Sequence, residues 1–573
     1  MLLKMYNDII LNDTLKNKEK EINIVNNELN KTQKENNAFS FWANFLRKDC
    51  LSNLSFRENQ ASTKFQLCCY ATVILGLLAH AFVFFNANYN ADENCTVTTF
   101  FDNDWQISIG RYWQPLYRAL IHDNFSAPWL IGAAALLYIA VAVYLITEML
   151  NISSKVFIVA ISGILATNLT VTLVMASFIN WADIFMFAML LNVFAVYLWS
   201  KHKNGFLLGS LAIAVALGLY QAYISVAICL VLMVLMLQLW NHSDVGAVFL
   251  NGIKSVGMLL IGGVIYAIGI KISCAITGVT LVSSDVNYNA ISGVGNFDGV
   301  SIPDLLKRTW SGCFGFLFES TNEYNTSFIK IFTVVLLLAI GVFCLLAVIK
   351  RFSTWKERGL FLLLLAFLPL GANVVFFISK GVIHELMYYA YFFIYIFAVL
   401  AITLVITYLK EHGKTRGPAV MLLATSTILF AIIFNNIQFA NVMYQKKDLE
   451  FKSTFSFMTR VVDRIEQMEE YEPGVTPVAF LTGKNYGIKQ LKPLLFFDEY
   501  STYFGTEEPT SITYFSTYWG YFQYVLNTPI WFAEQEYLDA LYQNEYVKQM
   551  AVFPAKDSVQ YVDGILVVKL DDF

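Results

Sequence analysis

The chain has 573 residues, of which 57% are hydrophobic and only 14% are charged, with a formal net charge of -4. Soluble globular domains carry about 25% charged residues, so this composition indicates an integral membrane protein. The acidic balance offers no basic field and the sequence has no zinc-type or base-stacking motif, which excludes nucleic acid as a partner. The eight cysteines are scattered and indicate neither a disulfide framework nor a CxxC metal site.

Residues 1–65 are predicted to be a cytoplasmic polar segment that ends in an interfacial helix. The start lacks the apolar region and cleavage site of a signal peptide, so the first membrane helix is expected to act as the targeting signal. The stretch "AFSFWANFLRK" groups aromatic residues ahead of Arg47 and Lys48, a pattern typical of a helix that lies in the inner headgroup region.

Residues 66–440 are predicted to be a polytopic α-helical membrane domain of about eleven transmembrane helices. About 20 apolar residues cross a hydrocarbon core of about 30 Å. The predicted spans are residues 66–86, 128–147, 156–176, 183–200, 205–219, 221–240, 255–275, 328–348, 360–378, 386–409 and 417–438. The fifth and sixth come from one long apolar run, which we divide at Tyr220-Gln221.

The distribution of Lys and Arg predicts the orientation of these spans. With a cytoplasmic N-terminus, the inner loops hold eleven Lys and Arg residues and the longer outer loops hold five. This bias follows the positive-inside rule. An odd number of spans then places the C-terminus outside the membrane.

Residues 441–573 have an ordinary composition and are predicted to be a small extracytoplasmic α/β domain. Apolar residues from Phe451 to Ile465 recur at steps of four and three, which predicts a helix that ends before Pro473-Gly474. "PVAFLTG" is typical of a strand. "SVQYVDGILVVKL" alternates around Asp563-Gly564, which predicts a hairpin with a type I′ turn.

Polar residues from distant segments collect at the predicted outer ends of the spans. An ionisable group at the bilayer centre costs at least about 2.5 to 3.5 kcal/mol, so ionisable residues inside spans usually have a task, and the predicted span centres have almost none. The residues at this level are Asp92, Glu93, Asp183, Tyr220, Gln221, Lys271, His384 and Glu385. Each alone is more simply a solvated loop residue or an interfacial hydrogen-bonding group, but their joint depth favours a shared site.

This set has the chemistry for group transfer from a membrane-bound donor. A partly buried carboxylate can take the proton of an attacking hydroxyl. Arg111 or Lys271 can neutralise a departing phosphate. Asp92 and Glu93 are neighbours and cannot face the same way on a regular element, so one of them would bind or position. Trp113 has an equally good interpretation as an interfacial anchor.

At these residues the sequence resembles the GtrII-type glucosyltransferases, polytopic enzymes of the GT-C class. The resemblance rests on the pair Asp92-Glu93, then "SIGRYWQPLYRAL" leading into "PWLIG", "WADIFMFAMLL" with Asp183, "GLYQAYISVA", "HELMYYAYFF" and "DGILVVKL". It covers roughly residues 66 to 570, and the N-terminal 60 residues fall outside it.

The resemblance implies transfer of a hexose, typically glucose, from a polyprenyl-phosphate carrier to a cell-envelope glycan outside the cytoplasmic membrane. The acidic residue of the first outer loop, the functional centre of the class, maps onto Asp92 with Glu93 beside it. The expected reaction is a single inverting displacement, with the proton passing to Asp92 and the phosphate stabilised by Arg111 and Lys271. Tyr514, Tyr518 and Trp519 are candidate sugar-stacking residues, although ordinary core aromatics fit them better.

Trp113 and the remaining polar residues at the outer ends of the spans are expected to bind substrate. These are Asp183, Tyr220, Gln221, His384 and Glu385. No cofactor beyond the lipid-linked donor is certain, and a divalent metal near Asp92, Glu93 and Asp183 stays open because carboxylate spacing cannot establish one.

Two other classes of function remain in view. A transporter or flippase of envelope precursors would predict inverted repeats, paired broken helices and polar groups at the bilayer midplane. We find no clear repeat, and only neutral groups such as Asn168 and Asn373 inside the spans. The second alternative is a non-catalytic scaffold whose outer domain binds glycan.

Overall fold

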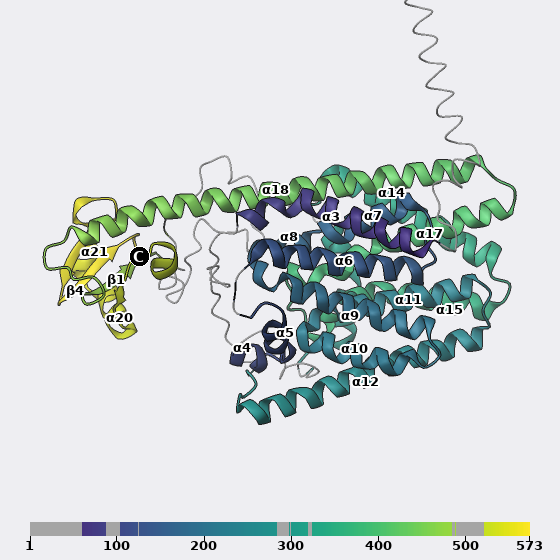
Figure 1. Cartoon of the computed structure of the whole chain (residues 1–573), viewed down its shortest axis with the longest axis horizontal. Helices are drawn as coiled ribbons and strands as arrows, with labels where there is room; N and C mark the ends of the chain where they lie inside the picture. The colour runs from purple at the N-terminus through teal and green to yellow at the C-terminus, as the bar shows by residue number, and fades with distance from the viewer. Residues whose placement is uncertain are drawn as a thin grey trace, which may run out of the picture.

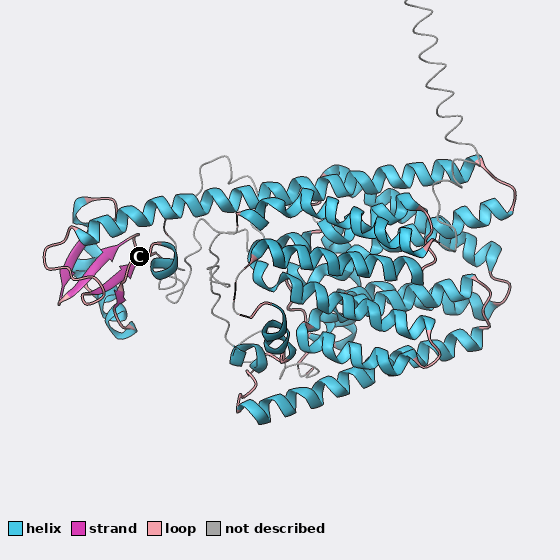
Figure 2. Cartoon of the chain, in the orientation of Figure 1, coloured by secondary structure: helices cyan, strands magenta, loops and turns pink. Residues whose placement is uncertain are grey.

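The computed structural model describes residues 60–86, 103–123, 125, 127–283, 297, 299–318, 324–483, 488 and 521–573. This part of the chain is a bundle of helices, joined by one long helix to a small unit of strands and short helices at the C-terminus (Figure 1, Figure 2). The predicted interfacial helix, the pair Asp92-Glu93 and the three candidate stacking aromatics lie outside the described residues.

Nine helical segments of the described chain are long and apolar enough to cross a bilayer, which confirms the helical membrane class. Their bounds are Ala61–Phe85 (α3), Pro128–Met149 (α6), Lys155–Ser177 (α7 and α8), Ile179–Lys201 (η1 and α9), Gln221–Trp240 (η2 and α11), Val245–Thr277 (α12), Ser327–Arg351 (α14 and η4), Glu385–Glu411 (η5 and α17) and Arg416–Glu466 (α18). Each of them overlaps one predicted span.

The predicted spans 205–219 and 360–378 also correspond to helices, but these are not among the nine long apolar segments. Helix α10 (Gly205–Leu219) has 15 residues, about 22 Å at 1.5 Å per residue, and packs between α9 and α12. Helix α15 (Trp355–Ala372) has Lys356, Glu357 and Arg358 in its first turn, and the short α16 (Val374–Ile378) follows it. The division of the long apolar run is confirmed, because α10 ends at Leu219 and η2 begins at Gln221.

One membrane segment is interrupted at Asn168, between α7 (Lys155–Thr167) and α8 (Leu169–Ser177). Asn168 is extended, with φ -67° and ψ 166°, and its side chain caps α8. The carbonyls freed at the interruption gain partners from other helices: Tyr389 donates to the Leu165 oxygen at 2.9 Å, and His80 Nε2 lies 2.8 Å from the Ala166 oxygen. A bilayer tolerates such a break because protein side chains satisfy the backbone groups.

A second interruption lies at Asn373, between α15 and α16. Its amide nitrogen donates to the Thr309 carbonyl of α13 (Ile302–Phe318) at 2.8 Å, and its oxygen accepts from the Tyr391 hydroxyl at 2.6 Å. Both breaks are therefore tied to η5 (Glu385–Phe392), a 3₁₀ segment that opens α17 (Phe393–Glu411) and carries Tyr389 and Tyr391.

Two short helices lie against one end of the bundle. Helices α4 (Asn103–Ser108) and α5 (Trp113–Ile121) sit beside the ends of α9 (Ala182–Lys201), α10 and α12 (Figure 1). Helix α5 is amphipathic: Gln114, Tyr117 and Arg118 are buried on one face, whereas Leu116 and Leu120 are exposed on the other. This segment closes the end of the bundle that the candidate site occupies.

Helix α18 (Arg416–Glu466) runs without interruption for 51 residues from the bundle into the C-terminal unit (Figure 1). The amphipathic helix predicted near residues 451–465 is its last part and not a separate element. It ends at Glu466, ahead of Pro473. The predicted boundary between residues 440 and 441 falls inside this helix.

The C-terminal unit is built on a four-stranded sheet of order β2-β1-β4-β3. Its strands are Pro477–Leu481 (β1), Trp531–Phe532 (β2), Val559–Val562 (β3) and Ile565–Lys569 (β4), and its short helices are Tyr521–Val525 (η8), Gln535–Gln543 (α20), Glu545–Gln549 (α21) and Lys556–Ser558 (η9). Strand β1 runs parallel to β2 and β4, and β3 and β4 pair as the predicted hairpin. Asp563 and Gly564 have φ values of 50° and 80°, as a type I′ turn requires.

Candidate functional site

Helix α5 is held at the bundle end by contacts with α10. Gln114 donates to the Leu219 carbonyl, the last of α10, at 2.6 Å. Trp113 packs on Gly218, where a side chain's Cβ would come within 2.3 Å of the indole. The sequence predicts that Trp113 binds substrate, and the structure places it in this helix contact.

The residues just before α5 contact polar groups of two other helices, η2 and α12. Gln221 donates to the Ile109 carbonyl at 3.0 Å and to the Tyr266 hydroxyl at 2.9 Å. Tyr266, from α12, donates in turn to the Gly110 carbonyl at 3.0 Å. Gly110 has φ 82°, a conformation that glycine adopts without a steric cost. These bonds fix the backbone from which Arg111 projects.

Arg111 lies at the centre of the predicted set. Its guanidinium carbon is 5.0 Å from the centroid of the Tyr220 ring, within cation–π range. Burial, and then the charge of Arg111, lower the pKa of His384 to about 4. His384 is therefore a neutral hydrogen-bonding group at pH 7. The structure thus brings together Arg111, Tyr220, Gln221 and His384; we name these four, with Tyr266, the arginine cluster.

Glu385 is half-buried beside this cluster, at the start of η5. Its backbone oxygen accepts a hydrogen bond of 2.9 Å from Thr170 of α8. This bond ties the beginning of η5 to the helix that follows the Asn168 break.

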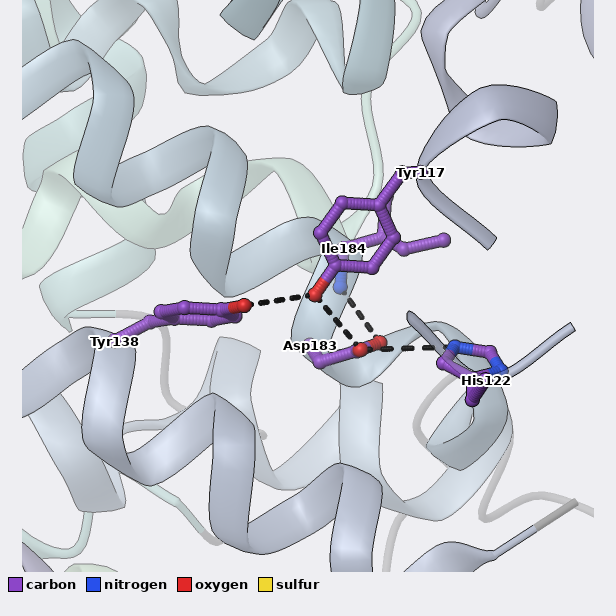
Figure 3. Close-up of polar contacts among 5 residues, drawn as sticks. All are labelled: Tyr117, His122, Tyr138, Asp183 and Ile184. Carbon is purple, nitrogen blue, oxygen red and sulfur yellow. Dashed lines mark hydrogen bonds and ion pairs between the residues drawn. The ribbon is translucent and has the colours of Figure 1, made fainter. Parts of the chain in front are cut away.

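Asp183 is 1% exposed and belongs to a second group, which meets α5 at Tyr117. Tyr117 donates to Asp183 Oδ2 at 2.9 Å, and the backbone N–H of Ile184 donates to Oδ1 at 2.8 Å (Figure 3). The Tyr117 and Tyr138 hydroxyls are 3.0 Å apart. Because Tyr117 gives its hydrogen to the carboxylate, Tyr138 must be the donor to Tyr117. Burial and the charge of Asp183 raise the pKa of Tyr117, so it stays a phenol.

His122 approaches the same carboxylate from the end of α5. Its Nε2 lies 3.6 Å from Asp183 Oδ2, and its side chain is 6% exposed (Figure 3). Neither ring nitrogen has a hydrogen-bond partner among the residues that the structure describes. We name Tyr117, His122, Tyr138 and Asp183 the aspartate network.

The two groups are neighbours. The Phe185 ring, two residues after Asp183, lies 4.5 Å from the Tyr220 ring of the arginine cluster. Arg118, one residue after Tyr117, lies 5.4 Å from the Trp181 ring of η1 (Ile179–Trp181). Burial lowers the pKa of Arg118 to about 10, so it keeps its charge at pH 7. The bundle end therefore contains two buried or half-buried arginines and one buried carboxylate.

Two parts of the predicted set are not in these groups. Lys271 is exposed on α12, five residues beyond Tyr266. Asp92 and Glu93 lie outside the described residues. Their predicted roles stay predictions.

The described side chains do not by themselves form a metal site. No group of three His, Cys, Asp or Glu side chains placed to hold an ion occurs among the residues described. Both oxygens of Asp183 already accept hydrogen bonds within the protein. Asp183 therefore fits a positioning role better than that of a ligand.

Several residues of the two groups are not among those that the sequence singles out. They are Tyr117, His122, Tyr138 and Tyr266, and the same is true of Thr170, which bonds the Glu385 carbonyl. A signal existed for Tyr117, because Gln114, Tyr117 and Arg118 share one helix face at the spacing i, i+3, i+4. Tyr138 and Tyr266 are single hydroxyls inside apolar spans, and nothing in the local sequence distinguishes them from other membrane tyrosines.

Comparison with known protein families gives a match. A family model described as Glucosyl transferase GtrII matches residues 81–402, more than half of the chain. This range includes every residue of the arginine cluster and the aspartate network. Neither the curated proteins nor the solved structures include a match to this chain.

Proposed function

This chain belongs to the GtrII family of glucosyl transferases, and from that premise we propose that it moves glucose from a polyprenyl-phosphate carrier to a cell-envelope glycan. In the proposal, the reaction takes place at the outer face of the cytoplasmic membrane. The N-terminus is cytoplasmic, eleven helices cross in a GT-C-like arrangement, and the C-terminal unit is extracytoplasmic.

The observation that carries the proposal is the arginine cluster. A guanidinium binds phosphate oxygens through paired hydrogen bonds. Arg111 stands over an aromatic ring and beside the amide of Gln221 and the neutral His384. A cation next to aromatic and uncharged hydrogen-bonding groups suits a sugar phosphate, with the phosphate at Arg111 and the hydroxyls at the neutral groups.

The proposed chemistry is a single displacement with inversion at the anomeric carbon. The acceptor oxygen forms its bond to that carbon as the bond from the carbon to the phosphate oxygen breaks. The proton of the acceptor hydroxyl goes to Asp92, or to Glu93 beside it, and the electron pair leaves with the phosphate. Arg111 stabilises the charge that develops on the phosphate, and Lys271 of α12 assists.

The aspartate network supports this chemistry by holding α5 in place. The carboxylate of Asp183 holds Tyr117, and through it the helix that begins two residues after Arg111. Glu385 fixes η5, which carries His384 at its start, through its backbone bond to Thr170. In the proposal these two acidic residues position substrate-binding groups. A divalent metal near Asp92 and Glu93 remains compatible, and no step depends on it.

The transporter alternative predicts broken helices whose unwound carbonyls bind an ion or substrate. The structure does have interruptions, at Asn168 and Asn373. At Asn168, however, the Leu165 and Ala166 oxygens are engaged by Tyr389 and His80, and the amide of Asn373 bonds Thr309 and Tyr391. These groups hold the protein together, which favours the transferase.

The test uses purified protein in lipid nanodiscs with polyprenyl-phospho-glucose and fragments of wall or lipopolysaccharide glycan. We expect a new glucosyl linkage, identified by mass and by the proton coupling of the anomeric carbon. Asp92→Asn is expected to lower the transfer rate by about 10²-fold or more, the usual contribution of a general base. Asp539→Asn, at an exposed position of α20, is the matched control and is expected to retain the wild-type rate.

Two results would contradict parts of the proposal. Transfer from no hexosyl carrier at all would overturn the function. Normal transfer by Asp92→Asn together with loss in Glu93→Gln would move the base to Glu93. Normal membrane insertion and folding of each variant must accompany the rates.

A further inference from the structure

An apolar cavity of about 290 Å³ lies between α13, α14 (Ser327–Leu346), α15, η5 and α17, with one residue from α11 (Ile224–Trp240). Its walls are hydrocarbon and thiol side chains, apart from Trp310 and Tyr391. The polar atoms of these two are engaged: the Trp310 indole donates to the Ala366 carbonyl and the Tyr391 hydroxyl to Asn373. A cavity without unsatisfied polar groups does not retain water, so its natural occupant is a hydrocarbon.

The mouth of this cavity is on the flank of the bundle. Trp310 of α13 and Leu362 of α15 line the cavity and are 45% and 49% exposed, respectively. On α15, Leu362 is followed by the exposed residues Leu363, Ala366 and Phe367, as expected of a face in contact with lipid. A chain could thus enter from the side, between α13 and α15.

The inner wall of the cavity and the arginine cluster both include residues of the η5 segment, counting its N-cap His384. Ala390 and Tyr391 of η5 line the cavity, and His384, at the start of the same segment, lies beside Arg111. A 3₁₀ segment rises about 2 Å per residue, so the six residues from His384 to Ala390 span about 12 Å. The cationic arginine cluster and the dry apolar cavity therefore lie about 12 Å apart along η5.

We infer that this cavity holds the part of the donor's isoprenoid chain nearest to the phosphate, with the phosphate at Arg111. The inference rests on the proposed function. At the start of η5 the positive charge of Arg111 complements a phosphate. Near its end the apolar cavity complements a hydrocarbon chain, so the two together fit an anionic lipid. Tyr389 and Tyr391 tie η5 to both helix breaks, so the segment between head and chain is rigidly placed.

Two adjacent leucines of α15 provide a matched test. Leu362 lines the cavity, whereas Leu363 does not, and they are 49% and 53% exposed, respectively. Leu362→Trp would fill the mouth, and Leu363→Trp would add the same bulk on a neighbouring lipid-facing position. Ala366→Trp, one turn beyond Leu362, is a second filling variant.

Transfer would be measured with undecaprenyl-phospho-glucose and with ethyl-phospho-glucose, whose two-carbon chain is too short to reach a cavity about 12 Å from His384. We expect Leu362→Trp and Ala366→Trp to raise KM for the long-chain donor about five-fold at unchanged kcat, the effect of losing a modest packing interaction. Their KM for the short donor should change less. Leu363→Trp should match wild type with both donors.

A readout without catalysis is photo-crosslinking of wild-type protein by an undecaprenyl phosphate with a diazirine near the phosphate. Labelled peptides should come from the segments that line the cavity, which are residues 310–317, 337–340, 362–372 and 390–397. Labelling elsewhere, or equal effects of Leu362→Trp and Leu363→Trp, would overturn the inference. Displacement of the label by excess phosphatidylglycerol would assign the cavity to ordinary membrane lipid. Absence of transfer by wild type with either donor would instead refute the proposed function, and the labelling result would still stand.

Discussion

Asp183 shows how a carboxylate is kept buried at the end of a membrane bundle. Its two oxygens accept from a phenol of α5 and from the first turn of its own helix, and an imidazole lies 3.6 Å away. A buried charge without such partners costs several kcal/mol, so the contacts that stabilise Asp183 also fix α5. Substitutions of Tyr117 and Tyr138 separate the contributions that these contacts make to the free energy of unfolding.

Tyr117→Phe is expected to destabilise the protein by about 1.5 to 3 kcal/mol, because it removes a hydrogen bond to a charged acceptor. Tyr138→Phe removes a bond between neutral hydroxyls and should cost about 1 kcal/mol. In the Tyr117→Phe background Tyr138 has lost its acceptor, so the second substitution should cost little. Thermal unfolding of the four proteins in detergent measures this cycle, and additive costs would show that the two hydroxyls are not coupled.

Burial of the neutral His384 makes part of the free energy of unfolding sensitive to acid. Its pKa is about 4 in the folded protein and about 6.5 in a free side chain. Between these values the unfolded chain binds a proton that the folded chain does not, so stability falls as the pH drops from about 6.5 towards 4. The contribution is fully present above pH 6.5.

His384→Gln should therefore lose less thermal stability than wild type between pH 7 and 4.5, and His202→Gln, at an exposed histidine, is the control. Unfolding temperatures recorded across this range provide the measurement. Identical pH dependence of wild type and His384→Gln would contradict the buried, neutral state of His384.

At the scale of elements, the site depends on how closely α5 approaches α10 and α12. Glycines permit that approach: Gly218 faces Trp113, and Gly269 faces Tyr112, whose ring is stacked on Tyr266 at 5.9 Å. A Cβ at Gly269 would come 2.1 Å from the Tyr112 hydroxyl oxygen. Tyr112 directly follows Arg111, so any shift there reaches the arginine cluster.

Gly269→Ala should consequently lower kcat/KM for glucosyl transfer about tenfold, because Tyr112 must move and displaces Arg111 by a fraction of an ångström. Gly263→Ala, on the same helix, meets nothing within 4 Å and should leave the rate unchanged. Both substitutions improve intrinsic helix propensity, so a difference in kcat/KM between the two variants comes from the contact of residue 269 with Tyr112. Equal rates in the two variants would show that Tyr112 does not position Arg111.

The interruption at Asn168 could not be predicted from the local hydropathy pattern. The apolar run that contains Asn168 predicts a single span, whereas the structure divides it into α7 and α8. An Asn inside an apolar run is ambiguous, because it caps a new helix only when other side chains satisfy the freed carbonyls. His80 and Tyr389, which do so, come from helices 88 and 221 residues away from Asn168 in the chain.

At the scale of the whole molecule, α18 links the bundle to the C-terminal unit as one helix (Figure 1). The composition changes near residue 440 while the helix continues, because its apolar surface first meets the bundle and then, through Phe457, Met458 and Val461, the core of the C-terminal unit. A change in composition thus marks a change of surroundings and not an end of secondary structure.

The sequence by itself determined the membrane class, the position of most helices, the division at Tyr220-Gln221, the C-terminal hairpin and the family resemblance. These features depend on hydropathy, on periodicity or on turn residues, which act over a few neighbouring positions. Only the tertiary structure decided that Arg111, Tyr220, Gln221 and His384 lie together, that Asp183 faces Tyr117 and His122, and that Lys271 is exposed. Such contacts join residues more than 60 positions apart, and the direction of a side chain across that separation depends on how whole helices pack.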